Sequence, residues 1–234
     1  MPGRGGTSHG IPRSTVGQGT AAARARRRME LLDAADHVIR RDGPNASMEV
    51  IAAEAGITKP ILYRHFGDKG GLYTALAERY ANALMSEIKD SLERGADPKR
   101  RLALTIDTYF AFLDSEPQIY RFLVHRAQSE RREVHDAIGA FVRDVAQEVA
   151  AVTRRELKVD GGESGEDLAE ALAFAVVGAV QMAGDWWLEH RRIPREQLVD
   201  QLVTLVWDGF ESYAAAPAIV STIAPKGNGE GESR

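Results

Sequence analysis

The chain has 234 residues, no cysteine and a formal net charge of −4, with 44% hydrophobic and 27% charged residues. This hydrophobic content suffices for a buried core, whereas the lack of cysteine excludes disulfides and thiolate metal sites. The first twenty residues contain no apolar stretch typical of a secretory signal, and no apolar run reaches the length that spans a membrane. We therefore expect a soluble, cytoplasmic protein that does not bind membranes. Residues 1–20 and 216–234 are rich in Gly, Ser and Pro without helical periodicity, which predicts disordered ends.

The chain between these ends shows a helical pattern throughout. The first helix is predicted over residues 21–41, with an apolar stripe made of Leu31, Leu32, Ala35, Val38 and Ile39. Two short helices follow within residues 47–66. Ser47 is a good N-cap, Gly56 stands where a left-handed residue commonly ends a helix, and Thr58 is the predicted cap of the second short helix. These signals predict two helices joined by a tight turn.

The second short helix has two distinct faces. Leu62 and Phe66 stand at i and i+4, so both point inward. The remaining surface carries cationic, polar and small apolar groups, namely Lys59, Pro60, Ile61, Tyr63, Arg64 and His65. A helix with one buried stripe and a cationic outer face suits the major groove of DNA. A helix-turn-helix that packs only against protein is the alternative, but it would not require these outer residues.

The later elements are also predicted to be helical. Apolar periodicity indicates helices over residues 68–93, 99–113, 118–128, 133–158, 167–189 and 196–213. They are separated by Gly95, Pro98, Pro117, a polar glycine loop at 159–165 and Pro194. No alternating strand pattern stands out. We therefore predict an all-α fold of about nine helices, with a domain boundary inside the helix over 68–93.

Charge is distributed unevenly along the chain. Residues 1–66 hold 10 Lys and Arg against 6 Asp and Glu, so the remainder carries a net charge of −8. A basic end on an acidic body is expected of a small DNA-reading domain. The first helix opens with a basic run, Arg24, Arg26, Arg27 and Arg28. Cations are unfavourable at that end of the helix dipole, which favours contact with phosphate or the minor groove over a solvated helix start.

Residues 47–69, SMEVIAAEAGITKPILYRHFGDK, resemble the DNA-binding domain of the TetR family of transcriptional regulators. The family pattern of A-x-x-A-G, L-Y-x-H-F and a following lysine is met by AAEAG at 52–56, LYRHF at 62–66 and Lys69. The resemblance implies a DNA-binding domain over 21–75 and an effector-binding and dimerisation domain over 76–215. Residues 1–20 would then be a basic arm or a plain tail, and 216–234 a disordered tail.

The resemblance also assigns the DNA contacts. Lys59, Pro60, Ile61, Tyr63 and Arg64 would face the groove of a double-stranded operator. Phosphate contacts would come from Thr58, Tyr63, His65 and Lys69. Ser47, Arg27 and Arg28 complete the predicted DNA-binding set. Ile61 departs from the small or polar residue that the family often has there.

The segment 168–187, LAEALAFAVVGAVQMAGDWW, is apolar almost all the way round and must be covered on several sides. In TetR-like proteins the last two long helices pair with those of a second chain, which implies a homodimer. The residues assigned to this interface are Ala175, Gly178, Ala179, Met182, Leu202, Leu205 and Val206. The alternative is that these helices complete the core of a monomer.

Bulky side chains gather in the middle of the second domain and are predicted to line an apolar effector pocket: Tyr109, Phe110, Phe112, Leu113, Tyr120, Phe122, Leu123, Trp186 and Trp187. Each alone is more simply a core residue. Segments 114–123 and 177–187 resemble the branch of the family that senses long-chain acyl-CoA and controls fatty-acid genes. The hypothesis is therefore a hydrophobic small-molecule effector, with a long acyl-CoA as the candidate.

Catalytic motifs are not found. The sequence has no phosphate loop, no G-x-S-x-G and no H-E-x-x-H, so we predict no catalytic residue, no metal and no cofactor. The interpretation is a ligand-responsive transcriptional regulator, in this family usually a repressor. An architectural DNA-binding protein without an effector is the alternative.

Overall fold

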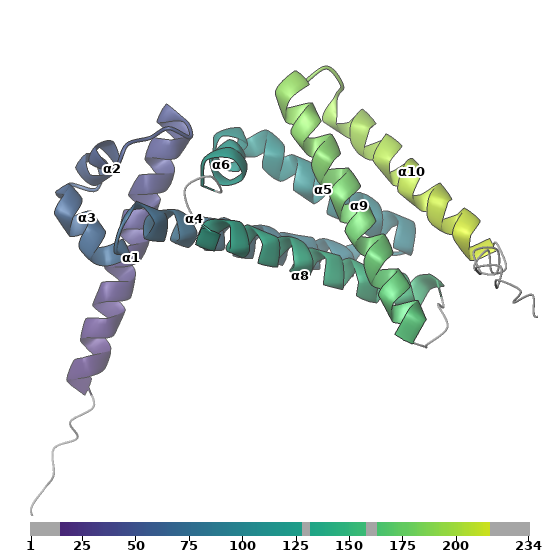
Figure 1. Ribbon diagram of the computed structural model, residues 1–234, viewed down its shortest axis with the longest axis horizontal. Helices are drawn as coiled ribbons and strands as arrows, with labels where there is room; N and C mark the ends of the chain where they lie inside the picture. The colour runs from purple at the N-terminus through teal and green to yellow at the C-terminus, as the bar shows by residue number, and fades with distance from the viewer. Residues whose placement is uncertain (1–14, 128–131, 158–162, 216–234) are drawn as a thin grey trace, which may run out of the picture. The chain divides into compact units, whose positions relative to one another are not determined.

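The computed structural model describes residues 15–127, 132–157 and 163–215 (Figure 1). Within those residues the chain forms nine α-helices and one π-helical segment and has no strand, which confirms the predicted all-α fold. The elements are α1 (Thr15–Asp42), α2 (Met48–Glu54), α3 (Lys59–Phe66), α4 (Lys69–Arg94), α5 (Pro98–Ser115), α6 (Pro117–Arg121), η1 (Phe122–Ala127), α8 (Arg132–Leu157), α9 (Glu163–His190) and α10 (Arg195–Ala215).

The chain divides into two compact units. The first comprises Met1–Ala83 and Ser115–Ala140, and the second comprises Leu84–Asp114 and Phe141–Arg234. The change from one unit to the other falls inside α4. The first unit thus takes in α6, η1 and the start of α8, a segment that lies far beyond residue 75 in the sequence.

Helix α1 is longer than the pattern predicts. It begins at Thr15, so residues 15–20, predicted to be disordered, are helical. Once a helix has nucleated, each further residue adds a hydrogen bond at little cost, and the chain has no proline between Pro12 and Pro44 to stop it. The rest of the predicted basic arm and the predicted C-terminal tail lie outside the described residues.

The core of the first unit forms around the predicted stripe of α1. Leu31, Leu32, Ala35, Val38 and Ile39 are all buried, as expected from their spacing. The helices α2, α3 and α4 contribute further buried residues to this unit, namely Ile51, Leu62, Leu72 and Leu76. Each fully buried aliphatic side chain of this kind contributes about 1.5–3 kcal/mol to folding.

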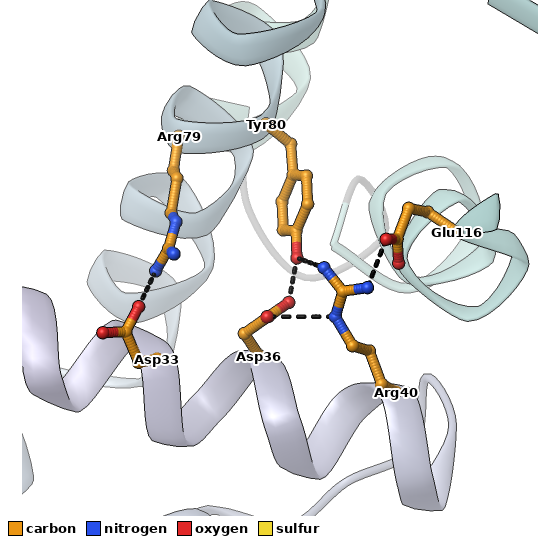
Figure 2. A network of polar contacts seen from close by, with 6 residues as sticks. All are labelled: Asp33, Asp36, Arg40, Arg79, Tyr80 and Glu116. Atoms are coloured by element: carbon orange, nitrogen blue, oxygen red, sulfur yellow. Dashed lines mark hydrogen bonds and ion pairs between the residues drawn. The ribbon is translucent and has the colours of Figure 1, made fainter. Parts of the chain in front are cut away.

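Polar side chains tie α1 to α4 and to the start of α6 (Figure 2). The guanidinium of Arg40 donates to Asp36 at 3.0 Å, to the hydroxyl of Tyr80 at 3.1 Å and to Glu116. The same Tyr80 hydroxyl donates to Asp36. Glu116 and Asp36 hold the pKa of Arg40 above its ordinary value, against the opposing effect of partial burial. Arg40 therefore joins three helical segments within the first unit.

The second unit is built around aromatic contacts between α5 and α9. Phe110 and Trp187 pack edge to face with ring centres 5.6 Å apart, and both are buried. The indole N–H of Trp187 donates to the Ile193 carbonyl at 2.7 Å, which satisfies its polar atom. Gly184 allows the close approach of the two helices, because a Cβ there would lie 2.8 Å from side-chain atoms of Tyr109 and Leu113.

The apolar length of helix α9 contradicts one prediction from the sequence, namely that no run is long enough to span a membrane. Its residues Glu166–His190 are long and apolar enough, by length and composition, to cross a membrane, although we expected no run of this kind. Only 17% of its most apolar stretch is buried in the chain. Alanine and glycine make up much of the stretch, so it is apolar without being bulky.

Candidate DNA-binding site

The turn between α2 and α3 is locked by backbone hydrogen bonds. The Gly56 N–H donates to the Ala53 carbonyl at 3.0 Å, and the Ile57 N–H donates to the Ala52 carbonyl at 2.9 Å. This pair of bonds is the Schellman arrangement, which needs a left-handed residue after the helix. Gly56 supplies it with φ +65, as its position predicted.

The two helix starts are capped differently. Ser47 accepts from the Val50 N–H at 3.3 Å, as predicted for the cap of α2. Thr58 has the extended backbone of an N-cap, but its side chain makes no capping hydrogen bond, contrary to the prediction. Its carbonyl instead accepts from the Ile61 and Leu62 N–H groups. The exposed hydroxyl of Thr58 is thus not used within the helix.

Helix α3 shows the two faces expected of it. Leu62 and Phe66 are buried, whereas Pro60 and Arg64 are exposed. Half-buried positions make up the remainder of the outer surface: Lys59, Ile61, Tyr63 and His65. Within the described residues, the side chains of Arg64 and His65 have no hydrogen-bond or ion-pair partner. The exposed Arg64 therefore keeps its hydrogen-bond donors available to another molecule.

Lys59 differs from Arg64 because it is already paired. Its ammonium donates to the carboxylate of Glu49 in α2 and lies 5.6 Å from the centre of the Tyr63 ring. The hydrogen bond to Glu49 raises the pKa of Lys59, and the same bond lowers the pKa of Glu49. The sequence pattern placed Lys59 on the outer face of the helix but did not reveal this partner.

Arg27 and Arg28, predicted to contact DNA, both have partners inside the protein. Arg27 donates to Glu30 at 2.8 Å and to the Ala55 carbonyl at the end of α2 at 3.4 Å. The guanidinium of Arg28 lies 4.8 Å from the centre of the Phe66 ring. These contacts join α1 to α2 and α3, a structural use that the basic run did not indicate.

The passage from α3 into α4 depends on Gly71, which the sequence analysis missed. The Asp68 carboxylate accepts from the Gly71 N–H at 2.9 Å and so caps α4. A Cβ on Gly71 would lie 1.9 Å from the Phe66 carbonyl oxygen. The available signal was a glycine pair in the first turn of a helix. Lys69, a predicted phosphate contact, lies beside this junction, with its ammonium 5.2 Å from the Tyr73 ring centre.

The predicted interface residues fall into two groups. On α9, Ala175, Ala179 and Met182 are exposed and Gly178 is half-buried. They line up at helical spacing with two exposed aromatic residues, Phe174 and Trp186. On α10, Leu205 is 68% exposed and Val206 is half-buried, whereas Leu202 is buried within its own chain.

The predicted pocket residues are divided between the two units. Tyr109, Phe110, Phe112, Leu113, Trp186 and Trp187 belong to the second unit, and Tyr120, Phe122 and Leu123 belong to the first. Phe122 packs edge to face on Tyr73, with ring centres 4.6 Å apart. Trp186 is exposed and stacks on His190. Among the described residues, no cluster of three His, Asp or Glu side chains is placed to hold a metal ion.

Comparison with known proteins connects both parts of the chain to one family. The model described as "Bacterial regulatory proteins, tetR family" matches residues 31–76, and that described as "Tetracyclin repressor-like, C-terminal domain" matches residues 87–218. An uncharacterized HTH-type transcriptional regulator of Mycobacterium tuberculosis is 32% identical over 185 residues, covering 79% of this chain and 77% of that protein. The HTH-type transcriptional activator FasR of Mycolicibacterium smegmatis is 30% identical over 195 residues, covering 82% and 87%.

A solved structure shows the same fold. The transcriptional regulator FadR from Bacillus subtilis, determined in complex with stearoyl-CoA, aligns with a TM-score of 0.62 over 77% of this chain and 98% of that chain. Sequence identity is 18%, so this likeness concerns the fold alone.

Proposed function

Because the chain belongs to the TetR family of DNA-binding transcriptional regulators, we propose that it is a dimeric, ligand-responsive repressor that binds a palindromic operator. The observation that carries the proposal is the outer face of α3, where Arg64 is exposed and has no partner among the described residues. Burying Leu62 and Phe66 on the opposite face fixes the direction in which this surface points.

The proposed contacts divide into base edges and phosphates. Arg64 and Lys59 would donate to guanine O6 and N7, while Pro60 and Ile61 would touch thymine methyl groups, with Tyr63 beside them. The unbonded hydroxyl of Thr58 suits a phosphate contact, together with His65, Tyr63 and Lys69. Ser47, Arg27 and Arg28 would lie at the margin of the same surface.

Arg64→Ala tests the reading of bases. Loss of a bidentate contact to guanine should weaken operator binding by about 1–3 kcal/mol and relax selectivity at one base pair of each half-site. Competition of operator variants against random duplex measures both effects. If selectivity among operator variants does not change, Arg64 does not read a base.

The apolar stripe of α9 supports a homodimer. Its exposed residues are small or flexible at the centre, which lets a second helix approach closely, and two equal copies would satisfy the two half-sites of an operator. Met182→Glu would place a charge in this interface, so the variant should sediment as a monomer and lose operator affinity. Glu166→Gln, at an exposed position of α9 that lies about 160° around the helix from Met182, is the control and should remain dimeric.

We propose a hydrophobic effector, with a long-chain acyl-CoA as the candidate, and hence genes of fatty-acid metabolism as the targets. The support is the aromatic set of the second unit together with the fold shared with FadR, whose structure holds stearoyl-CoA. If DNA and effector favour different arrangements of the dimer, each weakens the binding of the other by the same factor.

Thermal unfolding with a series of acyl-CoAs tests this part of the proposal. A ligand at one hundred times its Kd should stabilise the folded protein by about 2.7 kcal/mol. If no chain length raises the midpoint, the effector-independent architectural protein becomes the better interpretation. A reporter gene behind the operator then distinguishes repression from activation, the direction named for FasR.

A further inference from the structure

We infer that Glu49 is a specificity-determining residue, because it holds Lys59 in an intramolecular ion pair and so withholds this ammonium from DNA phosphates of arbitrary sequence. The inference rests on the proposed reading of DNA by α3. Glu49 lies in the first turn of α2, and Lys59 is the first residue of α3, so the pair joins the starts of the two helices.

The cations of α3 are thus of two kinds. Arg64 has no partner in the described chain and can meet DNA without losing a contact. Lys59 can bind DNA only by leaving Glu49, or by bringing the carboxylate along with it. Its position over the Tyr63 ring further fixes the direction of the ammonium group.

The ion pair between Glu49 and Lys59 is weak enough for a DNA contact to replace it. The side chain of Lys59 is 39% exposed and that of Glu49 is 64% exposed. Exposed ion pairs are weak, so a good DNA contact can replace this one. A phosphate is a poor replacement, because breaking the pair leaves the Glu49 carboxylate close to the negatively charged backbone.

A specific site can compensate where random sequence cannot. In the major groove the freed Lys59 can donate to guanine O6 and N7, and the carboxylate of Glu49 can accept from cytosine N4. The penalty therefore falls mainly on non-specific complexes. Removing the charge of Glu49 should strengthen binding to all duplexes but strengthen random duplex most.

The experiment compares wild type, Glu49→Gln and Glu54→Gln on an operator fragment and on random duplex of equal length, between about 50 and 200 mM salt. Glu54 lies on the same helix, but its partners are Arg41 and His37, so it controls for net charge. In Glu49→Gln, the released Lys59 should make the slope of log affinity against log salt steeper by about 0.9 for each DNA-binding domain. The loss of affinity between about 50 and 200 mM salt should then be about 3.5-fold larger for each domain. The ratio of operator to random affinity should fall several-fold.

A double variant shows whether the effect passes through Lys59. Loss of Glu49 should raise the affinity for random duplex less in the Lys59→Gln background than in wild type, because it then relieves only the repulsion between the carboxylate and the phosphates and releases no ammonium. Equal slopes and equal ratios for Glu49→Gln and Glu54→Gln would overturn the inference, as would a gain from the loss of Glu49 that is equally large with and without Lys59. If wild-type protein prefers no genomic fragment over random duplex, the proposed function itself fails, which is a separate outcome.

Discussion

Replacing Gly71 by alanine tests how closely α3 and α4 are joined. The added Cβ would lie 1.9 Å from the Phe66 carbonyl oxygen, whereas separations under 3.0 Å are essentially never seen for real Cβ atoms. The obstacle is backbone at the last residue of α3, so no rotamer change can relieve it. One of the two helix ends has to move by about 1 Å.

The expected cost follows from opposing effects. Overpacking of this kind costs about 1–3 kcal/mol, and alanine regains about 0.5–1 kcal/mol relative to glycine within a helix. The net loss should be about 1–2 kcal/mol, which lowers the unfolding midpoint by roughly 2–8 °C in a protein of this size. Displacement of Phe66 shifts the outer face of α3, so operator affinity should also fall. The loss of about 1.4 kcal/mol of base contact corresponds to a tenfold lower affinity, and we expect a fall of at least this size.

Urea unfolding and operator binding measure the two effects in the same preparation. Gly209→Ala is the matched control, because a Cβ on this helical glycine meets nothing within 4 Å and should leave stability unchanged or raised. If Gly71→Ala proves as stable as Gly209→Ala and binds the operator like wild type, the close contact between α3 and α4 is refuted.

The remaining predictions concern caps, the Arg40 contacts and pH. Ser47→Ala removes the hydrogen bond to the Val50 N–H and should cost about 1 kcal/mol in urea unfolding, whereas Ser47→Gly should cost only a few tenths. Arg40→Met leaves two partly buried carboxylates without their shared donor and should lower the free energy of unfolding by about 1–2 kcal/mol. Arg94→Met breaks a far more exposed pair and should lower it by less than about 0.5 kcal/mol. Equal losses in the two variants would contradict a special role for Arg40. The Glu49–Lys59 pair lowers the pKa of the carboxyl from its ordinary value of 4.5 and raises that of the ammonium from 10.5, so its stabilisation is present between these values. The difference in stability between wild type and Glu49→Gln should therefore vanish as the pH falls below about 4.5, and a difference that persists at pH 2 would argue against the pair.

The sequence by itself determined the features that depend on neighbours along the chain. Helix periodicity located the buried stripe of α1, and the left-handed conformation of Gly56 followed from its place after the last turn of α2. The outer and inner faces of α3 follow from the same spacing rule. The family pattern around Leu62 and Phe66 was also sufficient to predict the class of protein. These features are local because helical contacts join residues three or four positions apart.

Only the tertiary structure decided which polar side chains meet. Arg40 and Glu116 are 76 positions apart, and Lys59 and Glu49 are 10 apart on different helices, so no spacing rule within one helix brings them together. The contact that makes Gly71 necessary depends on how the chain turns from α3 into α4. Hydrogen bonds and ion pairs act over a few ångströms, and those distances are set by the packing of whole helices rather than by the pattern of any one of them.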